Sequence, residues 1–476
     1  MNIYFILLVL FCLINLISVF SLIFFERKEP TTTWAWLLIL LMLPGVGFIL
    51  YLLLGQNLSR QKIFREKKVI DKTRTDGLKE IQELYEENIS INENNKELIL
   101  MNYNHSGALF TPGNTVKTYT NGEEKFRSLF NDIRKAKKFI HIEYYIFRLD
   151  DLGEQLVNEL KYKVAEGVEV RLLVDGMGSK ELTKKQIRFI HDIGIKFSIF
   201  FPGILPHLNT RINYRNHRKI VVIDGEIGYV GGFNVGNEYI NRGKQFKFWR
   251  DTHIKIEGPA VNELNKRFIL DWDYASNENM NNMIKYFPKP KKKGDVGIQI
   301  VSSGPDHMEE YIKNAYMKII NNAKEYVYIQ TPYLVPDEPI LEALIISALS
   351  GVDVRLIVPG EPDHFFMEWI LSANIGNLIN YGVKIYRYNN GFIHSKTIVA
   401  DDNVCSIGTA NLDIRSFKLN FEVNAIIYDN KVAKEQKNIF LADQSFSSLV
   451  DKEQYEKRSR WLKIKESLVR LVAPIL

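Results

Sequence analysis

Cysteine is scarce in this chain: Cys12 and Cys405 are the two cysteines among its 476 residues. Two thiols exclude a disulfide framework and a thiolate metal cluster, and they favour a reducing compartment. An H-E-x-x-H stretch is also absent, and the glycines of Gly176-Met177-Gly178 lack the spacing of a dinucleotide-binding turn. We therefore expect a site without a metal ion or a cofactor, and we expect Cys405 to be a packed thiol without reactivity.

The sequence has no large excess of one sign of charge. Its 62 Lys and Arg residues and 56 Asp and Glu residues give a formal net charge of +6. This mild basic excess suits anionic partners without requiring nucleic acid, and we expect no nucleic acid partner. With 476 residues, the chain can form two or three domains of ordinary size and bury a large core.

Charge is missing altogether from the first 25 residues. As a helix, Ile3 to Phe25 is long enough to cross the roughly 30 Å hydrocarbon layer of a membrane. A cleaved signal peptide is disfavoured because a basic n-region and a small-residue cleavage site are both missing. A second apolar stretch runs from Trp34 to Leu54, and a neighbouring helix would cover the backbone that Pro44 loosens. We predict a hairpin of two transmembrane helices within residues 1–58.

Positive charges predict the orientation of this hairpin. Arg27 and Lys28 lie between the two apolar stretches, whereas seven Lys and Arg residues lie between Arg60 and Arg74. The positive-inside rule therefore places the C-terminal side in the cytoplasm. We interpret the larger cluster as topogenic rather than as a specific lipid site, although it attracts anionic headgroups in either case. Residues 59–114 are predicted to form a polar juxtamembrane connector that has some helix and no chemistry.

Further along the chain, helical periodicity alternates with short apolar strands, which predicts an α/β sandwich. The pattern occurs twice, because the strands near Ile142 and after Gly167 recur 187 and 184 residues later. We predict a duplicated α/β unit, with a first half over 115–290 and a second half over 291–476. The second half ends in an amphipathic helix, for which docking on the catalytic unit and contact with a membrane surface both remain open.

Each predicted half carries one copy of the same motif, H-x-K-x-x-x-x-D, and an Asn follows each His by seventeen positions. In both copies a β-branched run separates Lys from Asp, which predicts a strand. Two copies at matching offsets are hard to attribute to chance. The candidate residues are His217, Lys219, Asp224 and Asn234 in the first half and His394, Lys396, Asp401 and Asn411 in the second.

These residue types suit a phosphodiester when both motifs face one central site. One His attacks phosphorus, and the other protonates the leaving oxygen and then acts as a base on the incoming alcohol or water. Lys and Asn side chains hold the non-bridging oxygens as charge is redistributed. The spacing does not distinguish which of the two His residues is the nucleophile. Six other histidines lack motif context, and we interpret them as surface or packed residues: His141, His191, His207, His253, His307 and His364.

The paired motifs resemble those of the phospholipase D superfamily and, more narrowly, the bacterial cardiolipin synthases. The likeness extends over nearly the whole chain. It includes the Pro-Gly-x-Gly of the apolar hairpin and the stretches Tyr229 to Tyr239, Trp249 to His253 and Asn411 to Glu422. The motifs identify the superfamily with high specificity. They are less specific for the substrate, because relatives that make other phospholipids or cleave nucleic acid share them.

The resemblance implies a metal-free reaction through a phosphohistidine intermediate. One phosphatidylglycerol would receive the phosphatidyl group of another, which gives cardiolipin and glycerol, at the cytoplasmic face of a bacterial cell membrane. Other anionic phospholipids are expected partners. The acceptor range, the acyl-chain preference and the oligomeric state remain open.

The resemblance also implies a role for each candidate residue. His217 and His394 are the nucleophile and the acid/base pair, and the resemblance favours His217 as nucleophile. Asp224 and Asp401 belong to the catalytic motifs and are interpreted as structural supports. A carboxylate downstream of each motif is expected to orient the His of that motif, with Asp251 serving the first and Glu422 the second. The expected phosphate ligands are Lys219, Asn234, Lys396 and Asn411.

Two other functions remain open at this point. A membrane-anchored phosphodiesterase of the phospholipase D type, or another phosphatidyltransferase, would use the same site with a different attacking group. A catalytically inactive scaffold predicts decay of at least one motif, and both motifs are complete.

Overall fold

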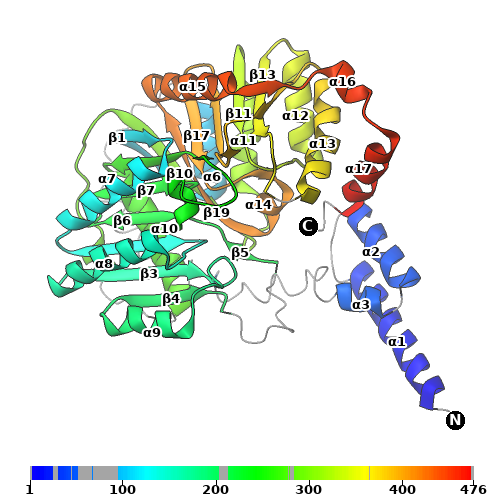
Figure 1. Ribbon diagram of the computed structural model, residues 1–476, viewed down its shortest axis with the longest axis horizontal. Helices are drawn as coiled ribbons and strands as arrows, with labels where there is room; N and C mark the ends of the chain where they lie inside the picture. The colour runs from blue at the N-terminus through cyan, green and yellow to red at the C-terminus, as the bar shows by residue number, and fades with distance from the viewer. Residues whose placement is uncertain are drawn as a thin grey trace.

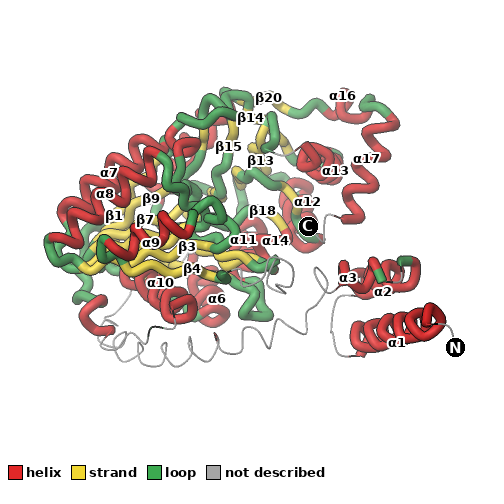
Figure 2. The backbone as a smooth tube through the Cα atoms, turned by 60° about the horizontal axis from the view of Figure 1, so that its bottom comes forward, coloured by secondary structure: helices red, strands yellow, loops and turns green. Residues whose placement is uncertain are grey.

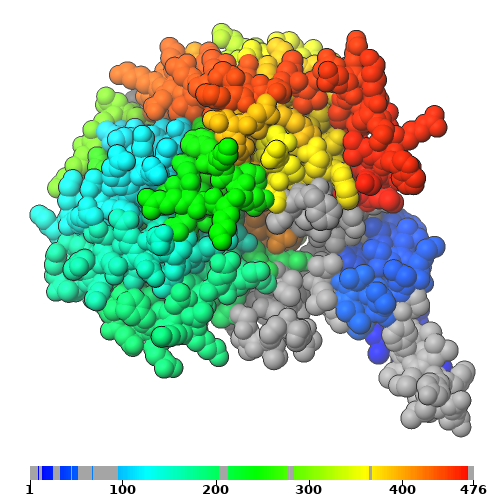
Figure 3. All heavy atoms as spheres, viewed as in Figure 1, coloured from blue at the N-terminus to red at the C-terminus, as the bar shows by residue number. Residues whose placement is uncertain are grey.

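The computed structural model describes residues 3–24, 30–43, 45–51, 67, 95–202, 213–276, 278, 283–363 and 365–472. Figure 1 shows one large α/β body with the N-terminal helices projecting from one side. In the space-filling view, the first half of the chain and the second half form one continuous surface (Figure 3).

The body is built on one 16-stranded sheet. At its centre, β1 (Phe110–Tyr119) pairs antiparallel with β10 (Val296–Ser303). Strands of the first half run outward from β1, and strands of the second half run outward from β10 in the corresponding order. The first series is β9 (His253–Glu257), β7 (Ile227–Gly231), β6 (Ile220–Ile223), β2 (Phe139–Tyr144), β3 (Glu169–Asp175) and β4 (Lys196–Phe200). The second series is β19 (Asn420–Tyr428), β17 (Val404–Gly408), β16 (Thr397–Ala400), β11 (Tyr326–Gln330), β13 (Asp353–Pro359) and β14 (Lys384–Tyr388), with β20 (Ser447–Leu449) at the edge.

This order confirms the predicted α/β class and repeats it once in each half. In both halves the motif strand is antiparallel to its two neighbours, and the pairs β2–β3, β3–β4, β11–β13 and β13–β14 are parallel. A pseudo-twofold axis therefore passes between β1 and β10. The motif strands β6 and β16 are buried along their whole length, which explains their nearly continuous apolar sequences.

Helices cover both faces of the sheet. Apolar side chains of α7 (Gly122–Lys135), α8 (Asp151–Ala165) and α9 (Lys184–Asp192) form one core with the first half of the sheet. The second half has an equivalent core under α11 (Tyr311–Asn322), α12 (Glu338–Leu349) and α13 (Phe365–Ile379). On the other face, one shared core contains residues of both halves together with α10 (Ala260–Ser276) and α15 (Asn430–Ser445). That shared core joins the halves into one unit.

Cys405 belongs to the shared core, where it is fully buried and free. Burial raises the pKa of its thiol well above the ordinary value. The prediction of a packed thiol is confirmed. Cys12 lies in α1, and its side chain is outside the described residues.

The N-terminal helices are α1 (Ile3–Phe24), α2 (Pro30–Met42) and α3 (Val46–Leu50). They form a separate small apolar cluster of Leu22, Trp36, Leu40 and Tyr51. Among the residues that the structure describes, no helix combines the length and the apolar character needed to cross a membrane. The helices are present, but the predicted transmembrane spans are not shown.

Part of the predicted connector packs on the catalytic body. Helix α6 (Lys96–Ser106) contacts α11 and β10, and β1 already begins at Phe110. Lys67 is fully buried, with its Nζ 3.5 Å from Asp271 Oδ1 and 3.4 Å from Asp306 Oδ2. A purely topogenic role is therefore wrong for Lys67, because the core of the catalytic body neutralises its charge. The rest of the basic cluster from Arg60 to Arg74 lies outside the described residues.

The C-terminal helix α17 (Arg460–Val472) docks on α13. Its Glu466 is buried and accepts a hydrogen bond from Ser372 Oγ at 2.7 Å. Docking on the catalytic unit is confirmed. Two views place α17 on the side of the body from which the N-terminal helices project (Figures 1 and 2).

Candidate active site

Two very short strands carry the chain into the two motif histidines. Strand β5 (Arg215–Asn216) pairs in parallel with the start of β19, and β15 (Phe392–Ile393) pairs in parallel with β8 (Trp249–Arg250). In both cases the partner strand belongs to the other half of the chain. Each motif histidine therefore enters the site held by the opposite half.

The backbone continues this pairing into the histidines themselves. His217 N–H donates to the Phe421 carbonyl at 2.9 Å, and His394 N–H donates to the Arg250 carbonyl at 2.6 Å. The next residue on each partner strand is a carboxylate, which the strand register places against the imidazole.

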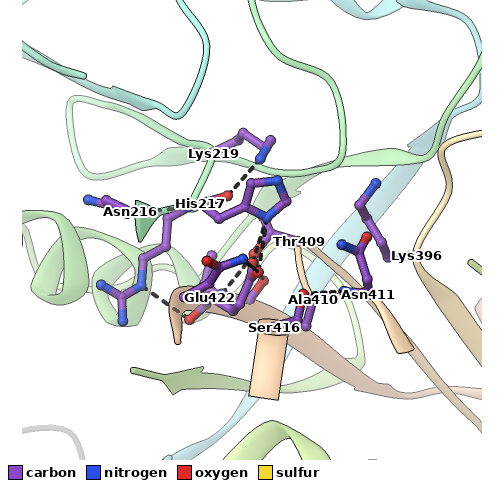
Figure 4. Close-up of polar contacts among 12 residues, drawn as sticks. Asn216, His217, Lys219, Lys396, Thr409, Ala410, Asn411, Ser416 and Glu422 are labelled. Carbon is purple, nitrogen blue, oxygen red and sulfur yellow. Dashed lines mark hydrogen bonds and ion pairs between the residues drawn. The ribbon is translucent and has the colours of Figure 1, made fainter. Parts of the chain in front are cut away.

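The two carboxylates are exchanged between the halves relative to our expectation. His217 Nδ1 lies 3.0 Å from both carboxylate oxygens of Glu422 (Figure 4), and His394 Nδ1 lies 2.6 Å from Asp251 Oδ2. The expectation that each carboxylate orients the His of its own motif was wrong. Strand pairing across the pseudo-twofold axis is the cause, because it delivers each carboxylate to the opposite motif. Both halves are required to complete either pair.

These contacts set the protonation of the imidazoles. A carboxylate only accepts hydrogen bonds, so Nδ1 of each His carries a proton and Nε2 is left as the basic nitrogen. Burial lowers the pKa of His217 to about 4 and that of His394 to about 3. Burial alone would raise the pKa of Glu422 and of Asp251, but the neighbouring Lys and His groups bring both below their ordinary values. At neutral pH the site therefore holds two neutral imidazoles beside two carboxylates.

The motif lysines lie beside the histidines. Lys219 Nζ donates to the His217 carbonyl at 2.6 Å, and Lys396 Nζ donates to the His394 carbonyl. Burial lowers the pKa of Lys219 to about 7 and that of Lys396 to about 8. An anion entering the site would favour the protonated ammonium form of both lysines.

The two motif asparagines have different hydrogen bonds. Asn234 Oδ1 accepts from the Ile146 N–H at 3.1 Å, and its Nδ2 donates to the Tyr239 hydroxyl at 3.1 Å. Asn411 Nδ2 instead donates to Asp413 Oδ2 at 3.1 Å. Both ends of the Asn234 amide are therefore hydrogen-bonded, whereas Asn411 Oδ1 has no hydrogen-bond partner.

Asp224 and Asp401 support the backbone rather than the reaction. Asp224 accepts three backbone N–H groups, from Lys137, Lys138 and Phe139, at 2.7 to 2.9 Å. Asp401 accepts the three equivalent N–H groups, from Lys324, Glu325 and Tyr326. Both aspartates adopt positive φ, 55° and 49°, in the turns that end β6 and β16. The geometry supports the structural interpretation of these two motif residues.

Replacing Asp224 by alanine is expected to lower the free energy of unfolding by about 2–4 kcal/mol, because three N–H groups lose their acceptor and alanine disfavours a left-handed backbone. Asp224→Asn is the matched control, since asparagine tolerates that conformation and keeps one acceptor oxygen. Denaturant-induced unfolding followed by circular dichroism measures the difference. Equal stability of the alanine variant and the wild type would contradict the structural role.

The histidines face a cavity of about 300 Å³. Aromatic rings flank both imidazoles: Tyr145 lies 4.9 Å from the His217 ring and Trp249 lies 5.2 Å from the His394 ring, between centroids. Of the eight motif residues, His217, His394, Asn234 and Asn411 reach the cavity wall. The other lining residues are Tyr145, Ile146, Arg215, Tyr239, Trp249, Tyr333, Asp363, Asp413, Arg415 and Asn420.

Sequence reasoning did not assign these other lining residues to the site. Proximity to the motifs in the sequence could have indicated three of them, because Arg215 precedes His217 by two positions and Asp413 and Arg415 follow Asn411 closely. Tyr333 and Asp363 had no such signal, since they come from loops far from either motif.

The histidines outside the motifs are mostly accounted for by packing. His141 is buried and its Nδ1 lies 2.8 Å from Asn265 Oδ1 in the shared core, and His253 is fully buried. His207 and His364 lie outside the described residues. Among the side chains that the structure describes, no group of three or more His, Cys, Asp or Glu residues is arranged to hold a metal ion.

Comparison with known proteins agrees with this architecture. The family model described as "Cardiolipin synthase, PLD-like domain" matches residues 129–272 and 316–444. A second model, described as "Phospholipase D-nuclease N-terminal", matches residues 13–56. The two segments of the first match correspond to the two halves of the sheet.

Individual relatives match over almost the whole chain. A cardiolipin synthase of Clostridium perfringens (strain SM101) is 49% identical over 457 residues, which cover 95% of this chain and 95% of the relative. A cardiolipin synthase of Staphylococcus aureus (strain Mu50) is 48% identical over 475 residues, which cover 98% of this chain and 95% of the relative. A solved phosphatidylserine synthase of Haemophilus influenzae Rd KW20 shares the fold, with a TM-score of 0.63 at 16% identity, covering 81% of this chain and 100% of its own.

The duplicated fold, the paired motifs and these matches define the class of protein, which is an enzyme of the phospholipase D superfamily. Within that class, the chain belongs to the bacterial cardiolipin synthases and is a phosphatidyltransferase.

Proposed function

We propose that this enzyme transfers the phosphatidyl group of one phosphatidylglycerol to the glycerol hydroxyl of another, giving cardiolipin and free glycerol through a phosphohistidine intermediate. The observation that carries this proposal is the crossed site, in which two neutral imidazoles face one cavity and each is oriented by a carboxylate. A two-step transfer needs one nucleophilic nitrogen and one acid/base nitrogen, and this arrangement offers both.

In the first step, His217 Nε2 attacks the phosphorus of the donor lipid. The bond from phosphorus to the glycerol oxygen breaks, and that oxygen takes a proton from the imidazolium of His394. The negative phosphodiester in the cavity favours this protonated form of His394, against the effect of burial. The products of the step are phosphatidyl-His217 and glycerol.

In the second step, His394 is neutral and acts as the base. It removes the proton from a hydroxyl of the acceptor phosphatidylglycerol as that oxygen attacks phosphorus, and the bond from phosphorus to His217 Nε2 breaks. Cardiolipin leaves, and His394 is protonated again for the next cycle. Glu422 and Asp251 keep the two imidazoles in the Nδ1-protonated tautomer throughout.

The lysines and Asn234 would stabilise the transferring phosphoryl group. Lys219 and Lys396 supply two buried cations, and the Asn234 amide has a second Nδ2 hydrogen beyond the one given to Tyr239. The Asn411 amide nitrogen instead donates to Asp413.

The acceptor lipid brings a second phosphate to the site. Two guanidinium groups, from Arg215 and Arg415, line the cavity in addition to the motif residues. Arginine pairs well with phosphate oxygens. These two cations support an acceptor that is itself a phosphodiester, which distinguishes a phospholipid from water or a simple alcohol.

Both substrates are membrane lipids, so the proposal includes a membrane location. The charge-free segment from Met1 to Phe25 and the apolar stretch from Trp34 to Leu54 support two transmembrane helices. The basic residues from Arg60 to Arg74 support a catalytic part on the cytoplasmic side of the bacterial cell membrane. A tethered active site would meet phosphatidylglycerol and other anionic phospholipids at high local concentration.

Reconstitution of the full chain in vesicles of phosphatidylglycerol alone tests the function. We expect cardiolipin and glycerol to appear in equal amounts, measured by lipid mass spectrometry and an enzymatic glycerol assay. Phosphatidic acid with glycerol, and no cardiolipin, would identify a phosphodiesterase instead. Absence of both products would also overturn the proposal.

A further inference from the structure

The two halves are not equivalent where they meet the cavity. A β-bridge joins Phe147 to Val235 in the first half, and the corresponding pairing joins Leu334 to Leu412 in the second. The residues beside these partners are therefore structural counterparts. Ile146 corresponds to Tyr333, and Gly236 corresponds to Asp413. The second half thus presents a phenol and a carboxylate where the first presents an alkyl group and a glycine.

The amide of Asn411 adds to this difference. Its neighbour Asp413 accepts hydrogen bonds, so the atom turned towards it is the amide nitrogen and the opposite atom is the carbonyl oxygen. Asn411 lines the cavity at 5% exposure, and its Oδ1 is buried without a hydrogen-bond partner. A buried carbonyl oxygen of this kind is costly unless a ligand donates to it.

A second pair of groups extends the same wall. The Tyr333 hydroxyl donates to Asp363 Oδ2, and both residues line the cavity. Because its hydrogen is already given to Asp363, the phenol oxygen can only accept from a ligand. Asp413 Oδ1 accepts the Ser416 N–H at 2.6 Å, yet each carboxylate oxygen retains a further acceptor position.

These four side chains therefore offer acceptors rather than donors, beside the Arg415 guanidinium that lines the same cavity. Phosphate oxygens are acceptors and carry negative charge, so carboxylates at this position would repel them. Hydroxyl groups donate, and a polyol donates several hydrogen bonds at once. The matching ligand is a neutral polyol.

We propose that Asn411, Asp413 and the pair Tyr333–Asp363 form a glycerol subsite on the second-half wall of the cavity. The inference rests on the proposed function and deepens it. The subsite holds the free hydroxyls of the leaving glycerol in the first step and the headgroup glycerol of the acceptor in the second. Both alcohols occupy the same subsite, because the first step breaks a bond between phosphorus and an alcohol oxygen and the second step forms such a bond.

The subsite also explains how the enzyme would select an alcohol over water. Water offers two hydrogens and cannot reach several acceptors spread along one wall. A site whose buried acceptors need a ligand's hydroxyls rejects molecules that lack them.

Competition between two alcohols tests the proposal. Full-length enzyme in phosphatidylglycerol vesicles receives equal concentrations of isotopically labelled glycerol and propan-1-ol, and mass spectrometry measures labelled phosphatidylglycerol against phosphatidylpropanol. We expect the wild type to prefer glycerol, and Tyr333→Phe and Asp363→Asn each to lower that preference about tenfold, the worth of one hydrogen bond to a polar or charged group. The product ratio is internal to each sample, so a partly unfolded variant still reports its preference.

Tyr145→Phe is the matched control, because it removes a phenol hydroxyl from the cavity wall beside His217. Its glycerol preference is expected to equal that of the wild type. An unchanged preference in both Tyr333→Phe and Asp363→Asn would overturn the subsite, and so would an equal fall in the control. Failure of the proposed function appears separately, as a wild type that forms no cardiolipin when phosphatidylglycerol is the only substrate.

Discussion

Replacement of His217 by alanine is expected to lower the rate of cardiolipin formation by at least about 10⁴-fold, because the variant lacks the nitrogen that would form the proposed phosphohistidine. Replacement of His394 by alanine is expected to cost a similar factor, since glycerol then leaves without a proton. The measurement is the initial rate of cardiolipin formation in phosphatidylglycerol vesicles.

His191→Ala provides the matched control for both variants. His191 is exposed on α9 and does not line the cavity, so its loss should leave the rate unchanged. Circular dichroism would verify that all three variants are folded. Substantial activity in either motif variant would contradict a mechanism that uses two histidines.

The second large effect is expected at the carboxylates. Glu422→Gln should lower the rate by about 10²- to 10⁴-fold, because a glutamine amide can present a donor to Nδ1 and so favour the wrong tautomer of His217. Asp251→Asn should act in the same way on His394. The steady-state rate of cardiolipin formation measures both effects.

The crossed pairing makes this prediction more specific. Adding Glu422→Gln to the His217→Ala variant should cause little further loss, because the carboxylate then has no imidazole to orient. Glu342→Gln, on the exposed surface of α12, is the control for removal of a carboxylate. A full additional loss in the Glu422 and His217 double variant would show that Glu422 acts on another group.

Local patterns were sufficient to predict the α/β class and the repeated order of its strands. The motif strands are continuous apolar runs, and buried strands of this kind repeat at nearly constant offsets. The two His-Lys motifs were visible for the same reason, since their spacing is encoded within eight residues.

The crossed carboxylates could not be predicted in this way. Glu422 is 205 residues from His217, and Asp251 is 143 residues from His394. Their pairing depends on the register of β5 with β19 and of β15 with β8, and three of these four strands are only two residues long. Such short strands have no periodicity to detect.

Lys67 illustrates a different limit. Its sequence context is a basic cluster beside an apolar stretch, which is typical of a topogenic signal. Its burial depends on Asp271 and Asp306, more than 200 residues away, which hold its charge inside the catalytic body. A rule based on composition treats every lysine of the cluster alike, whereas packing distinguishes this one.

The most direct test of the account is the position of the covalent intermediate. Wild-type enzyme is mixed with phosphatidylglycerol, quenched within milliseconds at alkaline pH, digested and mapped by mass spectrometry. If His217 is the nucleophile, a phosphatidyl or glycerophosphoryl group is expected on the peptide that contains His217 and none on the peptide that contains His394. An adduct on His394, or cardiolipin formation with no adduct on either histidine, would contradict the account.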